Sequence, residues 1–221
     1  MSRPLIVAMG GFPDDPLLDT LLSLARGRKL LYVGTAAMES AEHAVQVYER
    51  LRGRAEVSFL RFAPWPPADL RGLALGHDVI LVGGGNTANM LAVWRVHGFD
   101  RILREAWEAG IVLSGGSAGA ICWFEASITD SFGPQLAGMR DGLGFLPGSA
   151  CPHYDGEELR RPVYRRLVSE EGFPAGIAID DAAAAVFAGT ELEEVLTTRQ
   201  GSAAYRVSAA GEERLAARLL S

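Results

Sequence analysis

The sequence predicts an α/β protein with a mostly parallel sheet that helices cover on both faces. Short runs of Val, Ile and Leu alternate with longer amphipathic segments through the first half of the chain. Such uninterrupted apolar strands are typical of parallel sheets, in which both faces are buried. No linker, low-complexity segment or internal repeat interrupts the 221 residues, so we expect a single domain over residues 1–221.

The first half of the chain supplies the strands and helices of this sheet. Pro16 suits the first turn of a helix and Ser40 is a typical N-cap, while Gly27 and Gly53 are typical helix ends. The strands are expected at residues 5–10, 29–35, 55–60, 78–85 and 110–116. The helices are expected at residues 16–27, 40–53, 87–96 and 99–110.

The second half of the chain is less regular. Residues 129–156 hold many glycines and prolines, and a long irregular segment inside a compact domain is usually functional. A helix is expected at residues 157–172, with Pro162 in its first turn. Late, partly antiparallel strands and a terminal helix are expected, in that order, at residues 175–189, 192–198, 202–208 and 211–220.

Composition narrows the classes of function. The net charge of -6 argues against nucleic acid as a main partner, because phosphate binding requires a basic face. Cys122 and Cys151 form no CxxC pair, which predicts neither a zinc site nor a disulfide framework and fits a reducing, cytoplasmic setting. The apolar run Leu5–Met9 is too short for a signal peptide, and no run approaches the roughly 20 apolar residues that span a bilayer. We therefore expect a cytoplasmic protein with no membrane partner.

A serine stands among glycines where the fifth predicted strand meets the next helix. Residues 115–119 read Gly-Gly-Ser-Ala-Gly and match G-x-S-x-G, with Ser117 at the centre. In this pattern a nucleophilic serine projects from a sharp strand-to-helix turn that the glycines permit. The helix that follows aims free N–H groups at the developing oxyanion. The alternative is a tight turn in which Ser117 only caps the helix.

A second glycine cluster, at residues 82–90, also follows a strand and opens a helix. It contains no G-x-x-x-x-G-K-[ST], so the P-loop interpretation fails, and Ala88 occupies the third glycine position of G-x-G-x-x-G. Three functions of this cluster remain as alternatives. It could bind phosphate, bind a dinucleotide with alanine in place of the third glycine, or supply an N–H group to an oxyanion hole. Because sites in parallel sheets form beyond the carboxyl ends of strands, the two clusters are expected to converge.

One of the four histidines is the favoured base for Ser117. His43 and His97 fall on predicted helices and His77 precedes a strand, so these three are expected to be surface or turn residues. His153 stands in a loop, in the sequence CPHYDG. Beside a candidate nucleophile, such a loop histidine is the expected general base.

The base in turn requires an orienting carboxylate. Asp180 and Asp181 end an apolar run. Neighbouring side chains on a strand point to opposite faces, so only one of the two can face His153, and the spacing alone does not choose between them. The chain order Ser, His, Asp differs from the Ser, Asp/Glu, His order of α/β-hydrolases and disfavours that fold.

Four motifs in order, GGGNT, GGSAGA, CPHYDG and IAIDD, resemble those of the peptidase E family of serine peptidases, which includes aspartyl dipeptidases and cyanophycinases. The resemblance covers nearly the whole chain. It implies a flavodoxin-like fold similar to class I glutamine amidotransferase domains, and hydrolysis of short peptides without a metal or organic cofactor. The roles it implies are Ser117 as nucleophile, His153 as base, Asp181 as orienting acid, the N–H groups of Ala118 and of Gly84 or Gly85 as oxyanion hole, and Asn86 with Thr87 as residues that order the loop.

The sequence departs from the family pattern at the orienting acid. The family commonly has Glu where this chain has Asp181. Aspartate is one methylene shorter, so its hydrogen bond to His153 requires a closer backbone or a bridging water. Asp180 remains an alternative acid.

Substrate specificity follows less directly from the sequence. An aspartyl dipeptidase needs a cation for the substrate carboxylate, and arginines follow His153 on a predicted helix. The candidate substrate-binding residues are Asn86, Asp130, Ser131, Arg160 and Arg161. We expect a short peptide as substrate, with dipeptides that carry an N-terminal Asp as one case, and a monomer or homodimer. The alternatives are a relative with changed specificity, cyanophycinase-like or another acyl hydrolase, and a non-catalytic flavodoxin-like ligand-binding protein.

Overall fold

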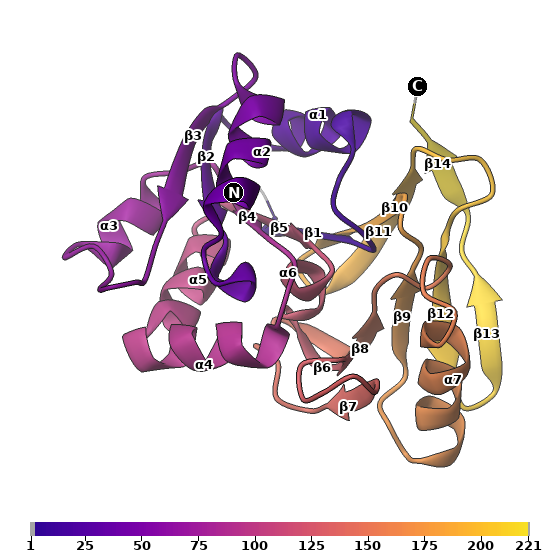
Figure 1. The fold of residues 1–221 in the computed structure, drawn as a ribbon. Helices are drawn as coiled ribbons and strands as arrows, with labels where there is room; N and C mark the ends of the chain where they lie inside the picture. The colour runs from indigo at the N-terminus through magenta and orange to yellow at the C-terminus, as the bar shows by residue number, and fades with distance from the viewer. Residues whose placement is uncertain (1–2, 221) are drawn as a thin grey trace.

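The computed structural model describes residues 3–220. In this part of the chain the helices connect two sheets, and most of them cover the larger one (Figure 1). The helices are α1 (Asp15–Leu24), the 3-10 helix η1 (Thr35–Ala37), α2 (Ala41–Leu51), α3 (Leu70–Leu75), α4 (Thr87–His97), α5 (Phe99–Glu108), α6 (Ala118–Ile121) and α7 (Arg160–Glu170).

The larger sheet has the strand order β14-β11-β10-β1-β5-β4-β2-β3. Its parallel part consists of β1 (Leu5–Met9), β5 (Val112–Gly116), β4 (Val79–Val82), β2 (Lys29–Val33) and β3 (Glu56–Leu60). Beside β1 lie β10 (Ala183–Ala188), β11 (Glu191–Thr197) and β14 (Ala217–Leu219), with antiparallel pairing of β1 to β10 and of β10 to β11. The predicted parallel sheet of five strands is confirmed.

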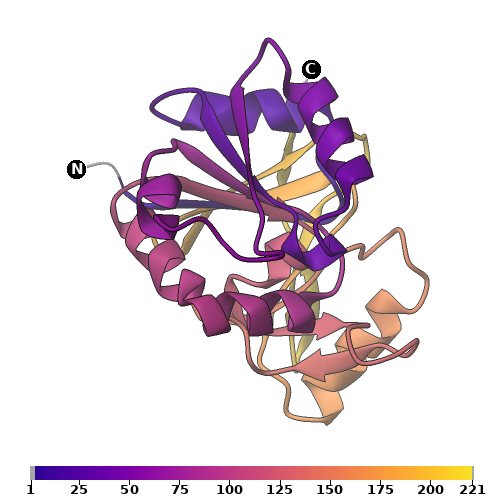
Figure 2. The same cartoon turned by 60° about the vertical axis from the view of Figure 1, so that its left-hand side comes forward.

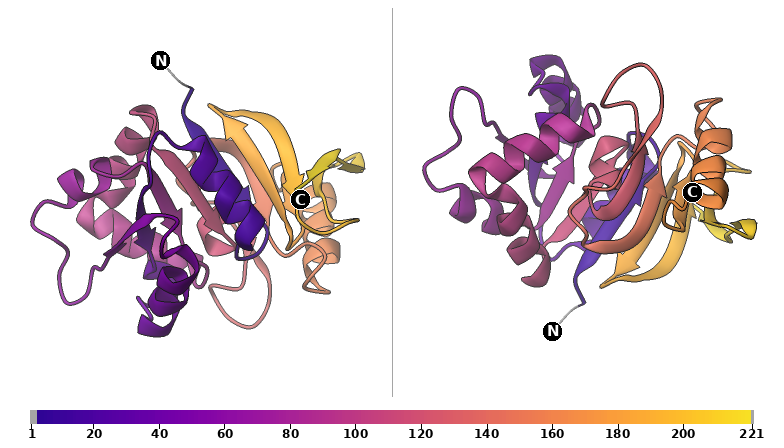
Figure 3. Two further views of the ribbon diagram at one scale, coloured as in Figure 1. Left: turned by 90° about the horizontal axis from the view of Figure 1, so that it is seen from above. Right: turned by 90° about the horizontal axis from the view of Figure 1, so that it is seen from below.

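Alternating side chains of the parallel strands enter two different cores. In β1, Ile6 belongs to the core that contains Trp94 of α4, whereas Val7 belongs to the core that contains Leu18 of α1. Both faces of the sheet are therefore apolar, as the continuous Val, Ile and Leu runs require. Figure 3 shows α1 lying across one face and α4 across the other. Helices on both faces were predicted, and this arrangement is confirmed.

A smaller sheet, which the sequence did not predict, has the strand order β13-β12-β9-β8-β6-β7. Its strands are β13 (Gly211–Arg214), β12 (Ala204–Ser208), β9 (Gly176–Ile179), β8 (Leu146–Cys151), β6 (Phe124–Thr129) and β7 (Ala137–Met139). Helix α7 packs on it through Tyr164 and Leu167, in a core of its own. Figure 2 shows α7 and β7 at one end of the molecule, away from α1 and α2.

Three expectations from the sequence were wrong. Residues 211–220 form β13 and β14 rather than a helix, because β13 pairs with β12 as a hairpin and β14 pairs with β11. The expected single strand at 175–189 is two strands in different sheets, separated by residues 180–182. The irregular segment 129–156 contains β7 and β8, whose pairing with neighbours overrides its weak local pattern.

Within residues 3–220, no helix combines the length and the apolar character needed to cross a bilayer.

Candidate active site

Ser117 lies at the tip of a sharp turn between β5 and α6. Its φ of 55° and ψ of −120° are rare for a residue with a side chain, and such strain is found mainly at functional sites. Neighbouring glycines make the turn sterically feasible. A Cβ at Gly116 would lie 2.2 Å from the carbonyl oxygen of Gly11, and one at Gly119 would lie 2.2 Å from that of Val82. The glycines on both sides of Ser117 therefore allow the ends of β1, β4 and β5 to pack closely around the turn.

The backbone of Ser117 is held by hydrogen bonds, whereas its hydroxyl is not used to cap the helix. The Ser117 N–H donates to the Met9 carbonyl oxygen at 3.2 Å, and the Ser117 carbonyl accepts from Ala120 and Ile121. The hydroxyl makes no side-chain capping bond to α6, whose residues are all described. The structure therefore contradicts the alternative in which Ser117 only caps the helix.

The Ser117 side chain opens into a cavity of about 310 Å³ beyond the carboxyl ends of the parallel strands. His153, the predicted base, lines the same cavity. The lining residues are Phe12, Tyr32, His43, Gln46, Val47, Gly84, Gly116, Ser117 and His153. The structure thus brings both glycine clusters and the loop histidine to one site.

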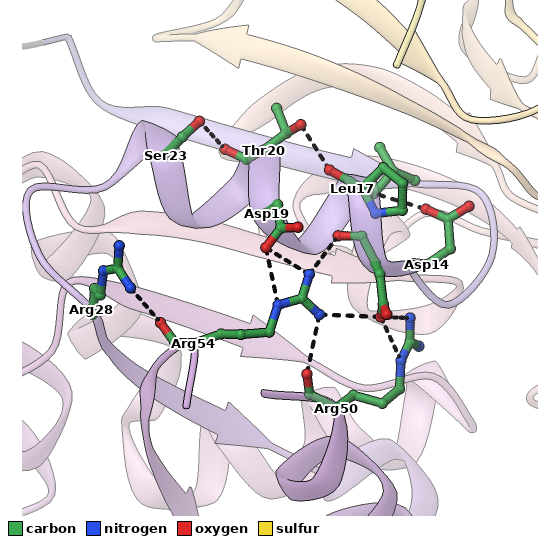
Figure 4. A network of polar contacts seen from close by, with 10 residues as sticks. Asp14, Leu17, Asp19, Thr20, Ser23, Arg28, Arg50 and Arg54 are labelled. Atoms are coloured by element: carbon green, nitrogen blue, oxygen red, sulfur yellow. Dashed lines mark hydrogen bonds and ion pairs between the residues drawn. The ribbon is translucent and has the colours of Figure 1, made fainter. Parts of the chain in front are cut away.

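Helix α2 forms one wall of this cavity and is tied to α1 by ion pairs. Arg50 on α2 pairs with Asp15 at 2.9 Å, and this hydrogen bond lowers the pKa of Asp15. Arg54, just beyond α2, pairs with Asp19 on α1 at 2.6 Å. Figure 4 shows Arg50 and Arg54 directed toward α1. These ion pairs therefore join the α2 wall to α1 outside the cavity.

His153 and Asp181 are in direct contact. The distance from His153 Nδ1 to Asp181 Oδ1 is 2.5 Å. The backbone of His153 has a φ of 53°, and its N–H donates to the Gly10 carbonyl oxygen at 3.3 Å. A carboxylate at Nδ1 favours the tautomer with a proton on that nitrogen and leaves Nε2 as a proton acceptor.

Glycines allow the shorter aspartate side chain to reach His153 without a bridging group. A Cβ at Gly156 would lie 1.9 Å from Asp181 Oδ2, and a Cβ at Gly11 would lie 3.1 Å from Asp181 Oδ1. The Gly11 N–H also donates to the Asp181 carbonyl oxygen at 3.2 Å. A closer backbone or a bridging water was expected to compensate for the shorter aspartate side chain. The structure has the closer backbone.

Asp180 has a different environment from its neighbour. It is 2% exposed, and its Oδ2 accepts a hydrogen bond from the Ala203 N–H at 2.8 Å. Its Oδ1 is buried without a hydrogen-bond partner among residues 3–220. Burial raises the pKa of Asp180 above its ordinary value. Of the two adjacent aspartates, the one in contact with His153 is therefore Asp181.

Backbone N–H groups beside Ser117 are available to a ligand. Across residues 3–220, the hydrogen bonds between backbone groups include none donated by Gly84, Gly85 or Ala118. Gly84 is close to the serine, since a Cβ placed on it would lie 3.3 Å from Ser117 Cβ. Gly85 has a φ of 135°, which favours glycine, and the loop is anchored by the Asn86 N–H bond to the Ala36 carbonyl oxygen at 2.8 Å.

Two of the candidate substrate-binding residues, Asn86 and Ser131, connect the start of α4 to the loop after β6 by hydrogen bonds. Asn86 Oδ1 caps α4 by accepting from the Asn89 N–H at 2.9 Å, and Asn86 Nδ2 donates to the Ser131 carbonyl oxygen at 2.9 Å. The Ser131 hydroxyl accepts from the Ala88 N–H at 3.2 Å. Asp130 is exposed. None of Asn86, Asp130 and Ser131 lines the cavity beside Ser117.

Arg160 and Arg161 also lie outside that cavity. Arg160 is 3% exposed, and its guanidinium donates to Glu157 at 2.7 Å and to the Ile128 carbonyl oxygen at 3.3 Å. Arg161 pairs with Glu212, and its guanidinium lies 5.2 Å from the centre of the Tyr154 ring. Both guanidinium groups are therefore engaged in the smaller sheet and α7.

Sequence reasoning missed most of the cavity wall. Phe12, Tyr32, Gln46 and Val47 were not singled out, and His43 was expected only at the surface. His43 is indeed exposed, yet it lines the cavity. The position of Phe12 just after the first strand is a signal that could have been used, because sites form at strand ends.

The two cysteines are buried free thiols, and burial raises the pKa of both. Among residues 3–220, no three His, Cys, Asp or Glu side chains are grouped so that they could hold a metal ion.

Comparisons with known proteins show what this chain is similar to. The model of peptidase family S51 matches residues 6–195. An uncharacterized peptidase, YgaJ, of Bacillus subtilis (strain 168) is 43% identical over 217 residues, covering 94% of this chain and 94% of the relative. A peptidase from an acI-B1 Actinobacterium has a similar crystal structure, with a TM-score of 0.70, 18% identity and coverage of 97% of this chain and 95% of that one. A candidate peptidase E protein from Listeria monocytogenes EGD-e has a TM-score of 0.66, 18% identity and coverage of 97% and 100%.

Proposed function

Because the chain belongs to peptidase family S51, the peptidase E family of serine-type hydrolases, we propose that it hydrolyses short peptides through an acyl-enzyme on Ser117. The observation that carries this proposal is the meeting of the strained Ser117 turn and the His153–Asp181 pair at one cavity. Strain at a serine, a histidine with an oriented tautomer and free N–H groups together match the needs of acyl transfer.

The chemistry would proceed in two halves. His153 Nε2 takes the proton from Ser117 Oγ as that oxygen attacks the peptide carbonyl carbon. The N–H groups of Ala118 and of Gly84 or Gly85 stabilise the oxyanion of the tetrahedral intermediate. His153 then gives its proton to the leaving amine, and the acyl group remains on Ser117 as an ester. His153 takes a proton from a water molecule as the water oxygen attacks the ester carbon, and returns it to Ser117 Oγ as the C–O bond breaks and the acid is released.

Asp181 acts through His153 in this proposal. Its carboxylate holds the imidazole orientation at 2.5 Å and stabilises the imidazolium that forms in each half of the reaction. The cavity of about 310 Å³ is at the small end of ligand sites, which supports a short peptide over a folded protein as substrate.

A related specificity other than that of aspartyl dipeptidases is the second candidate. The observation that favours it is that Arg160 and Arg161 are engaged elsewhere and line no part of the cavity. We further propose that the protein acts in the cytoplasm, because its two cysteines are buried free thiols, as is usual in reducing compartments.

The test is hydrolysis of a peptide library by the wild type and by Ser117→Ala, together with labelling by a fluorophosphonate. The wild type should be labelled at Ser117, and Ser117→Ala should lose about 10³-fold or more in kcat while its Tm stays near that of the wild type. Ser114→Ala is a matched control, because Ser114 lies on the same strand and donates to the Val7 carbonyl oxygen away from the cavity. Full activity of pure Ser117→Ala would refute the assignment.

A further inference from the structure

We propose that the cavity beside Ser117 selects peptides whose side chain next to the scissile bond is uncharged and apolar. This inference rests on the proposed function, since it assumes that peptides are cleaved at Ser117. Phe12, Tyr32 and Val47 supply two aromatic rings and an aliphatic side chain to the cavity. Such walls bind an apolar side chain by removing its surface from water.

The two aromatic residues of the wall are held in place. The Arg50 guanidinium lies 5.4 Å from the centre of the Phe12 ring, and the same guanidinium pairs with Asp15 at 2.9 Å. Tyr32 is 4% exposed and packs edge-on against Phe59, with ring centres 5.9 Å apart. The buried Tyr32 side of the wall is ordered before a ligand binds, so it loses little entropy on binding, whereas Phe12 is 45% exposed and offers apolar surface to the ligand.

The cavity offers no fixed charge to a charged side chain. None of its described lining residues is Asp, Glu, Lys or Arg. Arg50 stacks on Phe12 and pairs with Asp15, while Arg160 and Arg161 pair with Glu157 and Glu212. A charged substrate side chain would lose water here without gaining an ion pair, which is unfavourable.

The polar residues of α2 lie at the exposed edge of the cavity. His43 and Gln46 are both exposed, and Gln46 Nε2 donates to Glu42 at 3.4 Å. Water screens any charge that His43 carries at such a position, so it is a weak partner for a substrate carboxylate. Gln46 is long and exposed, which makes it the position at which a cation can be introduced without disturbing the core.

The first experiment compares two series of dipeptides at about pH 8, where a typical histidine side chain is neutral. One series is X-Ala and the other Ala-X, with X as Phe, Leu, Asp or Lys, so that both sides of the scissile bond are covered. In at least one series, kcat/KM for Phe and Leu should exceed that for Asp and Lys by about 10-fold or more, the usual range for a hydrophobic pocket. Equal or better cleavage of Asp or Lys in both series, or no cleavage of any dipeptide, would overturn the inference.

The second experiment introduces a cation at the edge of the cavity. In Gln46→Arg, the ratio of kcat/KM for Asp over Phe peptides should rise by about 10-fold. Val45→Arg is the matched control, because Val45 is the adjacent exposed residue of α2 and does not line the cavity. Gln46→Met should keep the apolar preference of the wild type. An unchanged ratio in Gln46→Arg, or the same rise in Val45→Arg, would contradict the assignment of this wall to substrate binding.

Fluorophosphonate labelling of each preparation separates the two proposals. If the wild type is not labelled at Ser117, the proposed function fails. If it is labelled but shows no apolar preference, the peptidase assignment stands and only the specificity inference fails.

Discussion

His153 Nδ1 and Asp181 Oδ1 lie 2.5 Å apart although the two residues belong to different connections of the chain. His153 follows β8 of the smaller sheet, and Asp181 lies between β9 of the smaller sheet and β10 of the larger one. Their contact therefore depends on how the two sheets pack. Any substitution that shifts the turn at residues 180–182 against the loop at residues 153–156 should act on catalysis through this one distance.

Replacing each of the two adjacent aspartates should give very different losses of activity. Asp181→Asn removes the charge that stabilises the imidazolium, so kcat should fall by several orders of magnitude, with about 10⁴ as the upper guide. Asp180→Asn should reduce kcat far less, because Asp180 bonds to the Ala203 N–H and not to His153. Steady-state kinetics on a cleaved peptide would check this. The reverse ranking would assign the orienting role to Asp180.

Lengthening the Asp181 side chain should reduce activity. The direct contact at 2.5 Å leaves no gap for another methylene, and Gly11 and Gly156 enclose the carboxylate. Asp181→Glu is therefore expected to lower kcat, although it preserves the charge. Activity at or above that of the wild type would show that the contact loosens in solution.

Adding a methyl group at Gly156 should displace the same carboxylate. An alanine Cβ at this position would lie 1.9 Å from Asp181 Oδ2, a distance that no structure can accept without movement. Gly156→Ala should therefore lower kcat with a smaller change in KM, and fluorophosphonate labelling should slow in parallel. Gly76→Ala is a control away from the cavity lining, because its Cβ would lie 3.0 Å from the Gly72 carbonyl oxygen and would require a much smaller shift than the Cβ at Gly156. Normal kcat in Gly156→Ala would argue against a catalytic role for the Asp181 position.

The value of kcat/KM should fall as pH is lowered from about pH 8 to about pH 5, because a protonated imidazole cannot accept the proton of Ser117. His153 is the residue proposed to accept this proton, so this measurement tests its role as base. Circular dichroism across the same range would exclude unfolding as the cause. A flat profile for a protein that stays folded would count against His153 as base.

Asp180 should make stability depend on pH in a particular direction. Burial raises the pKa of Asp180 above 3.8, so the folded state keeps a proton at pH values where the unfolded state has lost it. Its contribution to the free energy of unfolding therefore decreases as pH rises from that value through the raised pKa. Asn cannot titrate, so the stability of the wild type relative to Asp180→Asn should decrease over this range. Urea unfolding at several pH values measures the difference, and an increase with pH would contradict the prediction.

How much of the site follows from sequence depends on whether its parts are local. The Ser117 turn could be predicted because the strand, the glycines and the start of the helix are consecutive in the chain. The G-x-S-x-G pattern is typical of this arrangement. The loop histidine could be chosen from four candidates by elimination. The choice between Asp180 and Asp181 could not be made from spacing, since it depends on which side of the turn faces the His153 loop.

The sequence by itself determined the parallel half of the fold and the strained serine. Apolar runs of Val, Ile and Leu require a sheet buried on both faces, and the alternation of Ile6 and Val7 between two cores is the result. Only the tertiary structure showed that a smaller sheet exists, that residues 211–220 form strands, and which residues line the cavity. These features depend on contacts between residues that are far apart in the chain: strand pairing, ion pairs between helices and close contacts at glycines. Local sequence propensity does not predict such contacts.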